Sequence, residues 1–266
     1  MNPARSPLRY PGGKSRALPQ ILPLVPEFRE FREPFVGGGS SFLALKSRFP
    51  ERKFWINDIN EDLFLFWKFL RDENAGLVSE IRHVKEREKD GRALFGKLTK
   101  KPVKLSDFER AARFFILNRI TFSGTIESGG YSEQAFKGRF TESSVSRLEE
   151  TGKLLSGVKI TNDDYGKSLA APGEQVFIFL DPPYLSKTKS RLYGKKGDLH
   201  LGFDHPRFSK LVSACRHRWL ITYDDSPEVR ALFPSAKIKE WTLQYGMNNY
   251  KQGSAARGKE LFIYNY

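Results

Sequence analysis

The stretch that decides the fold is Phe177-Ile178-Phe179-Leu180, followed directly by Asp181-Pro182-Pro183-Tyr184. Four consecutive apolar residues predict a buried strand. The prolines end that strand because they have no backbone N–H to pair with a neighbour. Asp181 therefore stands at the carboxyl end of a strand, which is where ligands bind in open α/β sheets. We expect residues 181–184 to line a functional site.

Similar short β-type runs occur at 53–56, 158–161, 175–180 and 218–223, and each runs into a turn or an acidic residue. Helical stretches alternate with them, which predicts an α/β fold with a mostly parallel, Rossmann-like sheet. Two further β-type segments, 237–245 and 259–264, have only a loop between them. They are expected to form an antiparallel pair at one sheet edge.

The stretch 61–152 has a different character. Leu63, Phe66, Trp67 and Leu70 follow helical spacing, and a second helical pattern surrounds Phe114. We predict a mainly helical insertion over 61–152 that divides the sheet domain into residues 1–60 and 153–266.

A glycine-rich motif runs from Pro34 to Phe42 and precedes a predicted helix over Ser40–Arg48. Its glycines, Gly37 and Gly39 among them, let backbone approach a ligand closely. Asp58 ends the next strand, 19 residues after Gly39, where a carboxylate can accept hydrogen bonds from ribose hydroxyls. A dinucleotide fingerprint would place a third glycine at Phe42. The motif therefore favours S-adenosylmethionine (AdoMet) over NAD, although a glycine turn without a ligand is the alternative.

The chemistry of residues 181–184 fits methylation of an adenine amine. The Asp181 carboxylate can accept a hydrogen bond from one N6–H, and the Pro182 carbonyl can accept a hydrogen bond from the other. Both acceptors stabilise the positive charge that develops on nitrogen as the methyl group arrives. Tyr184 offers a flat face on which a flipped base can stack. A strand-end turn without a chemical role is the alternative.

The order of these motifs resembles that of the Dam-like DNA adenine methylases, in which the glycine motif precedes the DPPY motif. The resemblance covers nearly the whole chain and begins at Leu8-Arg9-Tyr10-Pro11-Gly12-Gly13-Lys14. It implies a class I AdoMet-dependent methyltransferase fold with an inserted target-recognition domain. It further implies that Tyr10, Lys14, Phe35, the glycine motif and Asp58 contact AdoMet. Asp181 would then be shared between the cofactor and the target amine.

By the same resemblance, residues 117–124 precede a DNA-reading hairpin whose tip would lie at 128–132. We expect DNA contacts from these residues: Arg119, Ser123, Tyr131, Lys137 and Arg139. Ser123 stands where GATC-methylating members carry asparagine, so the resemblance does not extend to their recognition sequence. The run after Tyr184 contains Lys187, Lys189 and Arg191, and we interpret it as a loop that grips phosphates around the flipped adenine. An exposed loop that is merely basic is the alternative.

Composition supports a nucleic-acid partner, because 45 basic residues against 31 acidic ones leave a net charge of +14. The predicted insertion is nearly neutral, so most of the excess belongs to the sheet domain. No apolar run approaches the roughly 20 residues of a membrane span. The single cysteine, Cys215, suits a reducing cytoplasm. The four histidines lack ligand-like spacing, so we expect no metal, and we expect a monomer in solution.

Three other functions fit the sequence less well. RNA adenine and protein glutamine methyltransferases tend to carry asparagine at the position of Asp181, and neither explains the long insertion. A non-catalytic DNA-binding relative would not need to retain Tyr10, Lys14, Asp58 and Asp181 together. A cytosine-C5 enzyme needs a cysteine beside proline, whereas Cys215 lies between alanine and arginine. The sequence therefore favours site-specific transfer of a methyl group from AdoMet to N6 of a flipped adenine in double-stranded DNA.

Overall fold

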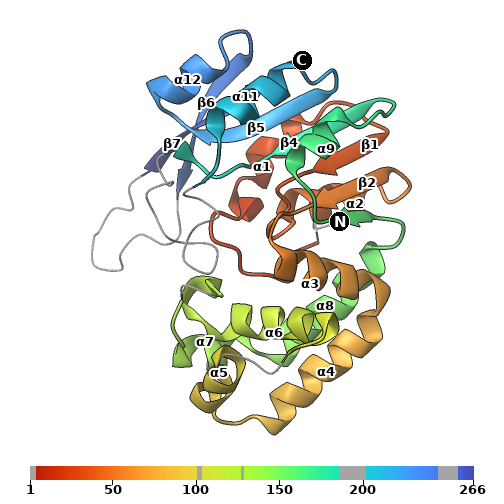
Figure 1. Ribbon diagram of the computed structural model, residues 1–266, viewed down its shortest axis with the longest axis vertical. Helices are drawn as coiled ribbons and strands as arrows, with labels where there is room; N and C mark the ends of the chain where they lie inside the picture. The colour runs from red at the N-terminus through yellow and green to blue at the C-terminus, as the bar shows by residue number, and fades with distance from the viewer. Residues whose placement is uncertain (1–3, 101–103, 127–128, 186–201, 245–256) are drawn as a thin grey trace.

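The computed structural model describes residues 4–100, 104–126, 129–185, 202–244 and 257–266. Its centre is a sheet of seven strands in the order β3-β2-β1-β4-β5-β7-β6 (Figure 1). The strands are β1 Glu30–Glu33, β2 Lys53–Asn57, β3 Lys159–Thr161, β4 Val176–Leu180, β5 Arg218–Asp224, β6 Lys237–Gln244 and β7 Arg257–Tyr264.

The first five strands of the chain pair in parallel, with β1 between β2 and β4. The last two strands are antiparallel: β7 lies between β5 and β6 and pairs with both. This arrangement confirms the predicted α/β class, the mostly parallel sheet and the antiparallel edge pair. It is the sheet of a class I methyltransferase.

Alternate residues of β4 enter two different hydrophobic clusters, which explains why the whole strand is apolar. Phe177 and Phe179 belong to a cluster that includes Phe42. Ile178 and Leu180 belong to a cluster on the other face. A parallel sheet covered on both faces is expected to have continuous apolar strands rather than alternating ones.

The helices that cover the sheet are short. Helix α2, Ser40–Arg48, contributes to the Phe42 cluster. Helices α9 Tyr165–Ala170, α11 His205–Ser213 and α12 Pro227–Leu232 contribute to the opposite cluster. Near the N-terminus lie η1 Lys14–Arg16, α1 Leu18–Ile21 and η2 Leu22–Leu24.

A group of helices lies below the sheet in Figure 1, and we call it the helical segment. It comprises α3 Glu61–Asp72, α4 Asn74–Arg87, α5 Gly91–Thr99, α6 Asp107–Ile120, the turn η3 Phe122–Gly124, α7 Glu133–Arg139 and α8 Glu142–Leu154. Asn60 caps α3 by accepting from the Leu63 amide, and Ser106 with Glu109 forms a capping box at α6. Phe66 stacks on Phe115 between these two helices.

The hydrophobic cluster that contains Phe42 continues into the helical segment without interruption. The division of the chain at residues 60 and 153 therefore stays a prediction. Among the described residues, no helix combines the length and the apolar character needed to cross a membrane.

Candidate active site

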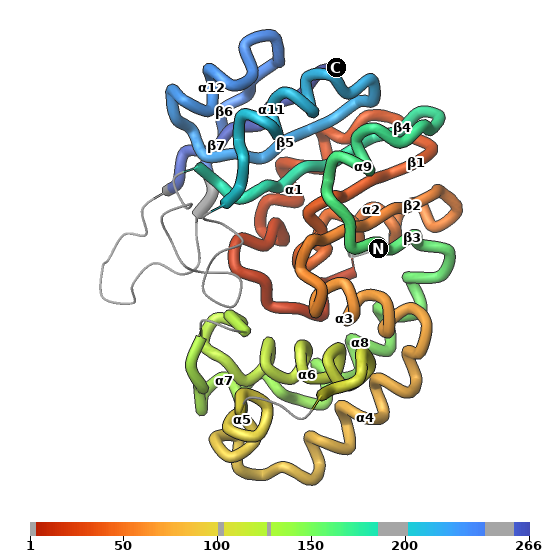
Figure 2. Tube along the Cα trace, in the orientation of Figure 1, coloured from red at the N-terminus to blue at the C-terminus, as the bar shows by residue number. Residues whose placement is uncertain are grey.

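Three carboxylates lie at the carboxyl edge of the parallel strands. Glu33 is the last residue of β1, Asp58 directly follows β2, and Asp181 directly follows β4. The three strands are neighbours in the sheet, so their ends lie side by side. Figure 2 shows the N-terminal segment, in red, between the sheet and the helical segment. Hydrogen bonds join it to both sides: Ser6 donates to the Gly38 carbonyl, and Asn118 of α6 bonds to the backbone of Arg9.

Asp181 is held by two donors from distant parts of the chain. The Lys14 ammonium lies 2.7 Å from its Oδ1 atom, and the Thr222 hydroxyl donates to the same atom at 2.7 Å. The ion pair is well shielded, since the Lys14 side chain is 7% exposed and that of Asp181 is 21% exposed. Lys14 also donates to the Gly12 carbonyl at 3.1 Å. These contacts fix the position of the carboxylate.

The glycine motif forms a turn that only glycine fits. Gly37 and Gly39 have φ angles of +46° and +67°, which side-chain-bearing residues rarely adopt. A Cβ atom on Gly37 would lie 2.8 Å from the Tyr10 ring, and one on Gly39 would lie 2.9 Å from the Trp67 ring. The Trp67 indole also donates to the Gly37 carbonyl at 3.1 Å. The turn is thus enclosed between the N-terminal segment and α3.

Asp58 closes the other side of this turn. Its carboxylate accepts from the Gly37 amide and from the Asn60 amide, each at 3.0 Å. Burial raises the pKa of Asp58 to about 6, against the effect of these amide donors. A carboxylate has about four acceptor positions, so a half-buried Asp58 keeps capacity for the hydroxyls of a ribose. The site formed by the glycine turn and Asp58 therefore fits AdoMet.

Glu33 is a member of this site that our sequence reasoning missed. Its carboxyl is buried and accepts from the Phe42 amide in the first turn of α2 at 2.9 Å. Burial, and next the Asp181 carboxylate, hold the pKa of Glu33 well above its usual range. The available signal in the sequence was an acidic residue immediately before Pro34, where the glycine motif begins.

Tyr184 is buried, and its ring is fixed from three sides. The ring stacks on Tyr223, and the Lys14 ammonium lies 4.9 Å from the ring centroid. The hydroxyl donates to Glu260 Oε2 of β7 at 2.8 Å. Burial, reinforced by the Asp181 charge, raises the pKa of Tyr184 well above its usual range. Glu260 and Thr222 were also missed by sequence reasoning. The signal for Thr222 was a polar residue inside an apolar strand, whereas Glu260 stands just before the apolar run of β7.

Phe35 belongs to an aromatic group next to the glycine turn. Its ring lies 5.3 Å from Tyr165 and 5.8 Å from Phe203, measured between centroids. The residues after β3 hydrogen-bond to neighbouring segments. Asn162 donates to the Asp58 carbonyl at 2.8 Å, and Asp164 caps α9. These contacts connect the end of β3 to the site.

The residues predicted to contact DNA have different positions. Arg119 corrects one expectation: its side chain is only 4% exposed, and it donates to the Pro7 carbonyl, because α6 packs against the N-terminal segment. It is not available to phosphates or bases in this structure. Ser123 lies in η3 with a φ angle of +56°. Tyr131 forms an antiparallel bridge with Thr121.

Two further predicted contacts lie on α7, where Lys137 forms an exposed ion pair with Glu133 at 3.0 Å and Arg139 is the last residue. The basic residues Lys187, Lys189 and Arg191 lie outside the described residues. Sequence reasoning also missed Phe122 of η3, a large apolar side chain that is 69% exposed.

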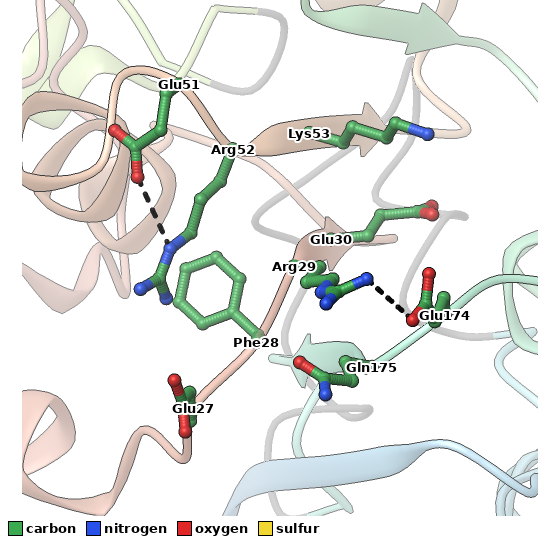
Figure 3. Close-up of a pocket in the computed structure, with 9 residues that line it drawn as sticks. All are labelled: Glu27, Phe28, Arg29, Glu30, Glu51, Arg52, Lys53, Glu174 and Gln175. Atoms are coloured by element: carbon green, nitrogen blue, oxygen red, sulfur yellow. Dashed lines mark hydrogen bonds and ion pairs between the residues drawn. The ribbon is translucent and has the colours of Figure 1, made fainter.

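One cavity, of about 510 Å³, lies at the opposite edge of the sheet (Figure 3). Residues at the amino ends of β1, β2 and β4 line it. Because these are the opposite ends of the strands, the cavity lies away from the three carboxylates. The charges of its lining are largely neutralised by ion pairs such as Arg29–Glu174 at 2.6 Å. Among the described residues, no group of three or more histidine, cysteine, aspartate or glutamate side chains is placed to hold a metal ion.

Comparison with known proteins agrees with this geometry. The family described as D12 class N6 adenine-specific DNA methyltransferase matches residues 10–247. The type II methyltransferase M.MjaIII of Methanocaldococcus jannaschii is 28% identical over 69% of this chain and 71% of its own length. The type II methyltransferase M1.LlaDCHI of Lactococcus lactis subsp. cremoris is 27% identical over 97% and 94%. The DNA adenine methylase of Escherichia coli K12 is 26% identical over 69% and 66%.

The family match spans the glycine turn, Asp58, the helical segment and the Asp181–Tyr184 turn in one stretch. The chain belongs to the D12 class of N6 adenine-specific DNA methyltransferases.

Proposed function

We propose that this enzyme methylates an adenine that is flipped out of double-stranded DNA, with the target amine held between Asp181 and Tyr184. One observation carries the proposal. The Lys14 ammonium already lies 2.7 Å from Asp181 Oδ1 and 4.9 Å from the centre of the Tyr184 ring. A nitrogen donor therefore fits between this carboxylate and this ring.

Family membership implies AdoMet as the methyl donor, and when bound it supplies an electrophilic methyl group on a sulfonium. The residues that would hold it are those of the glycine turn, with Tyr10 against the turn and Asp58 toward the ribose. The pKa of Asp58, raised to about 6, still leaves the carboxylate mostly ionised at neutral pH. An ionised carboxylate makes stronger hydrogen bonds to hydroxyls than a protonated one.

Asp181 and Pro182 act on the target amine. The carboxylate accepts a hydrogen bond from one N6–H and the Pro182 carbonyl accepts a hydrogen bond from the other, which favours a more tetrahedral nitrogen. The negative charge of Asp181 stabilises the positive charge that develops on that nitrogen. The amine takes the place of the Lys14 ammonium, so Lys14 moves aside as the base arrives. Tyr184, fixed by Glu260 and Tyr223, then presents a rigid stacking face.

The DNA side of the proposal rests on η3 and α7. Phe122 is exposed in η3, which lies between the two bridged residues Thr121 and Tyr131. An exposed aromatic ring can stack on a base or wedge into a base step, and such contacts accompany DNA distortion. Among the described residues, we propose Lys137 and Arg139 for contacts with DNA phosphates.

Expression in cells that lack adenine methylation, followed by modification-sensitive sequencing of genomic DNA, tests this function. We expect N6-methyladenine in one defined sequence context, which would also identify the recognition sequence. The Asp181→Ala variant, expressed at the same level, is the control and should leave the DNA unmodified. A folded wild-type protein that leaves no N6-methyladenine would refute the proposal.

A further inference from the structure

The last three residues of β5 hold the turn from Asp181 to Leu185 at successive points. Thr222 donates its hydroxyl proton to Asp181 Oδ1 at 2.7 Å. Tyr223 stacks on Tyr184, and Asp224 accepts from the Leu185 amide at 3.1 Å. Strand β5 pairs directly with β4, from which the turn emerges. One strand thus supports the turn from Asp181 to Leu185.

Thr222 differs from the other donor to Asp181 in one respect. Lys14 reaches Asp181 through a flexible side chain from the N-terminal segment, whereas Thr222 is completely buried within the sheet. The terminal torsion of an aspartate is broad. Its carboxylate is therefore oriented by hydrogen bonds rather than by its own rotamer preference.

We propose that Thr222 is a positioning residue, which keeps the Asp181 carboxylate oriented while the target amine replaces the Lys14 ammonium. Once Lys14 has moved, the Thr222 hydroxyl is the remaining described donor on that carboxylate. This inference rests on the proposed function. It assigns a role in methyl transfer to a residue that contacts neither the base nor the cofactor.

This role of Thr222 predicts which kinetic or binding constant changes when its hydroxyl is lost. Without DNA, Lys14 still holds Asp181, so loss of the Thr222 hydroxyl should leave the fold and AdoMet binding unchanged. With DNA bound, the carboxylate would turn freely and the amine would be misaligned. The defect should therefore appear in kcat and not in the affinity for AdoMet.

The test compares Thr222→Val, which removes the hydroxyl, with Thr222→Ser, which keeps it. The measured quantity is the initial rate of transfer of labelled methyl from AdoMet to genomic DNA from cells without adenine methylation. We expect Thr222→Val to lower kcat about 10- to 100-fold, the usual effect of losing a hydrogen bond to a charged group. Thr222→Ser should stay within about threefold of wild type, because the hydroxyl donor remains.

Thr151→Val is the matched control, because Thr151 is also buried and donates to a backbone carbonyl of α8, that of Arg147, at 2.7 Å. It should leave kcat unchanged. Melting temperature and calorimetric AdoMet affinity are measured for all variants, and Thr222→Cys replaces Thr222→Val if the latter does not fold.

The proposal is overturned if Thr222→Val retains the wild-type kcat, or if serine fails to restore it while the fold is intact. It is also overturned if the loss is entirely one of AdoMet affinity. A wild-type enzyme that transfers no methyl group would instead refute the proposed function.

Discussion

The carboxyl edge of the sheet and the outer surface of the helical segment handle charge in opposite ways. At the edge, charged groups are shielded and contact one another, as Lys14 and Asp181 do. In the helical segment, ion pairs such as Arg82–Glu142 lie at the surface, where 36% and 53% of the two side chains are exposed. Shielded charges have strong mutual effects, whereas exposed pairs are screened by water. Methyl transfer should therefore depend on individual charges at the edge and hardly on exposed ion pairs such as Arg82–Glu142.

The largest expected effect is at Asp181. Replacing it by alanine removes the acceptor for the amine and leaves the Lys14 ammonium without its partner. We expect methyl transfer to fall by about 100- to 1000-fold, as for other losses of a group that stabilises transition-state charge. Transfer of labelled methyl to unmethylated genomic DNA measures it. An Asp181→Ala enzyme with a rate near wild type would refute the mechanism even if DNA binding were unchanged.

The second effect is at the glycine turn. Gly37→Ala places a Cβ 2.8 Å from the Tyr10 ring in a backbone conformation with φ of +46°. Left-handed backbone costs a residue with a side chain about 1–2 kcal/mol. If the turn shifts to relieve that strain, AdoMet affinity should fall about tenfold, as measured by calorimetry.

The matched control is Gly96→Ala in α5, where a Cβ would meet no atom within 4 Å. It should leave AdoMet affinity unchanged and stabilise the helix slightly. Equal affinities for both alanine variants would mean that the turn does not shape the cofactor site.

Local patterns explain why so much of this edge could be predicted from sequence. Asp181 directly follows an apolar run, and Asp58 follows one after a single asparagine, Asn57. Their place at a strand end therefore needs no knowledge of the rest of the fold. The strands, the edge pair and the helix after the glycine motif were likewise predicted from short stretches. Each of these predictions depends on neighbours along the chain.

The contacts that could not be predicted join distant residues. Thr222 reaches Asp181 only because β5 pairs with β4, and Glu260 reaches Tyr184 only because β7 returns beside β5. Arg119 shows the same limit, here for a contact that was predicted and not for one that was missed. Its basic side chain suggested a DNA contact, but the N-terminal segment covers it. Burial of a helix face by a remote segment leaves no local pattern.

A third effect concerns Asp58 and the dependence of AdoMet affinity on pH. Its carboxyl has a pKa raised to about 6, so lowering the pH below 6 protonates it before AdoMet binds. Protonation weakens its hydrogen bonds to ribose hydroxyls. AdoMet affinity should therefore fall about tenfold between pH 7 and pH 5 and change little above pH 7. Calorimetric titration across this range measures it.

Asp58→Asn provides the control, since an amide does not titrate in this range. Its affinity should be lower than wild type at pH 7 and nearly independent of pH. A wild-type affinity that stays constant from pH 5 to pH 7 would show that Asp58 does not contact the cofactor.

The smallest effect is expected in the helical segment. Arg82 donates to Glu142 at 2.9 Å and so joins α4 to α8. Because the pair is exposed, Arg82→Ala should lower the free energy of unfolding by less than about 1 kcal/mol. Methyl transfer should remain at the wild-type rate. Chemical denaturation and the same transfer assay measure both quantities. A marked loss of activity with normal stability would show that this exposed ion pair also serves the reaction, and the contrast between shielded and exposed charges would fail.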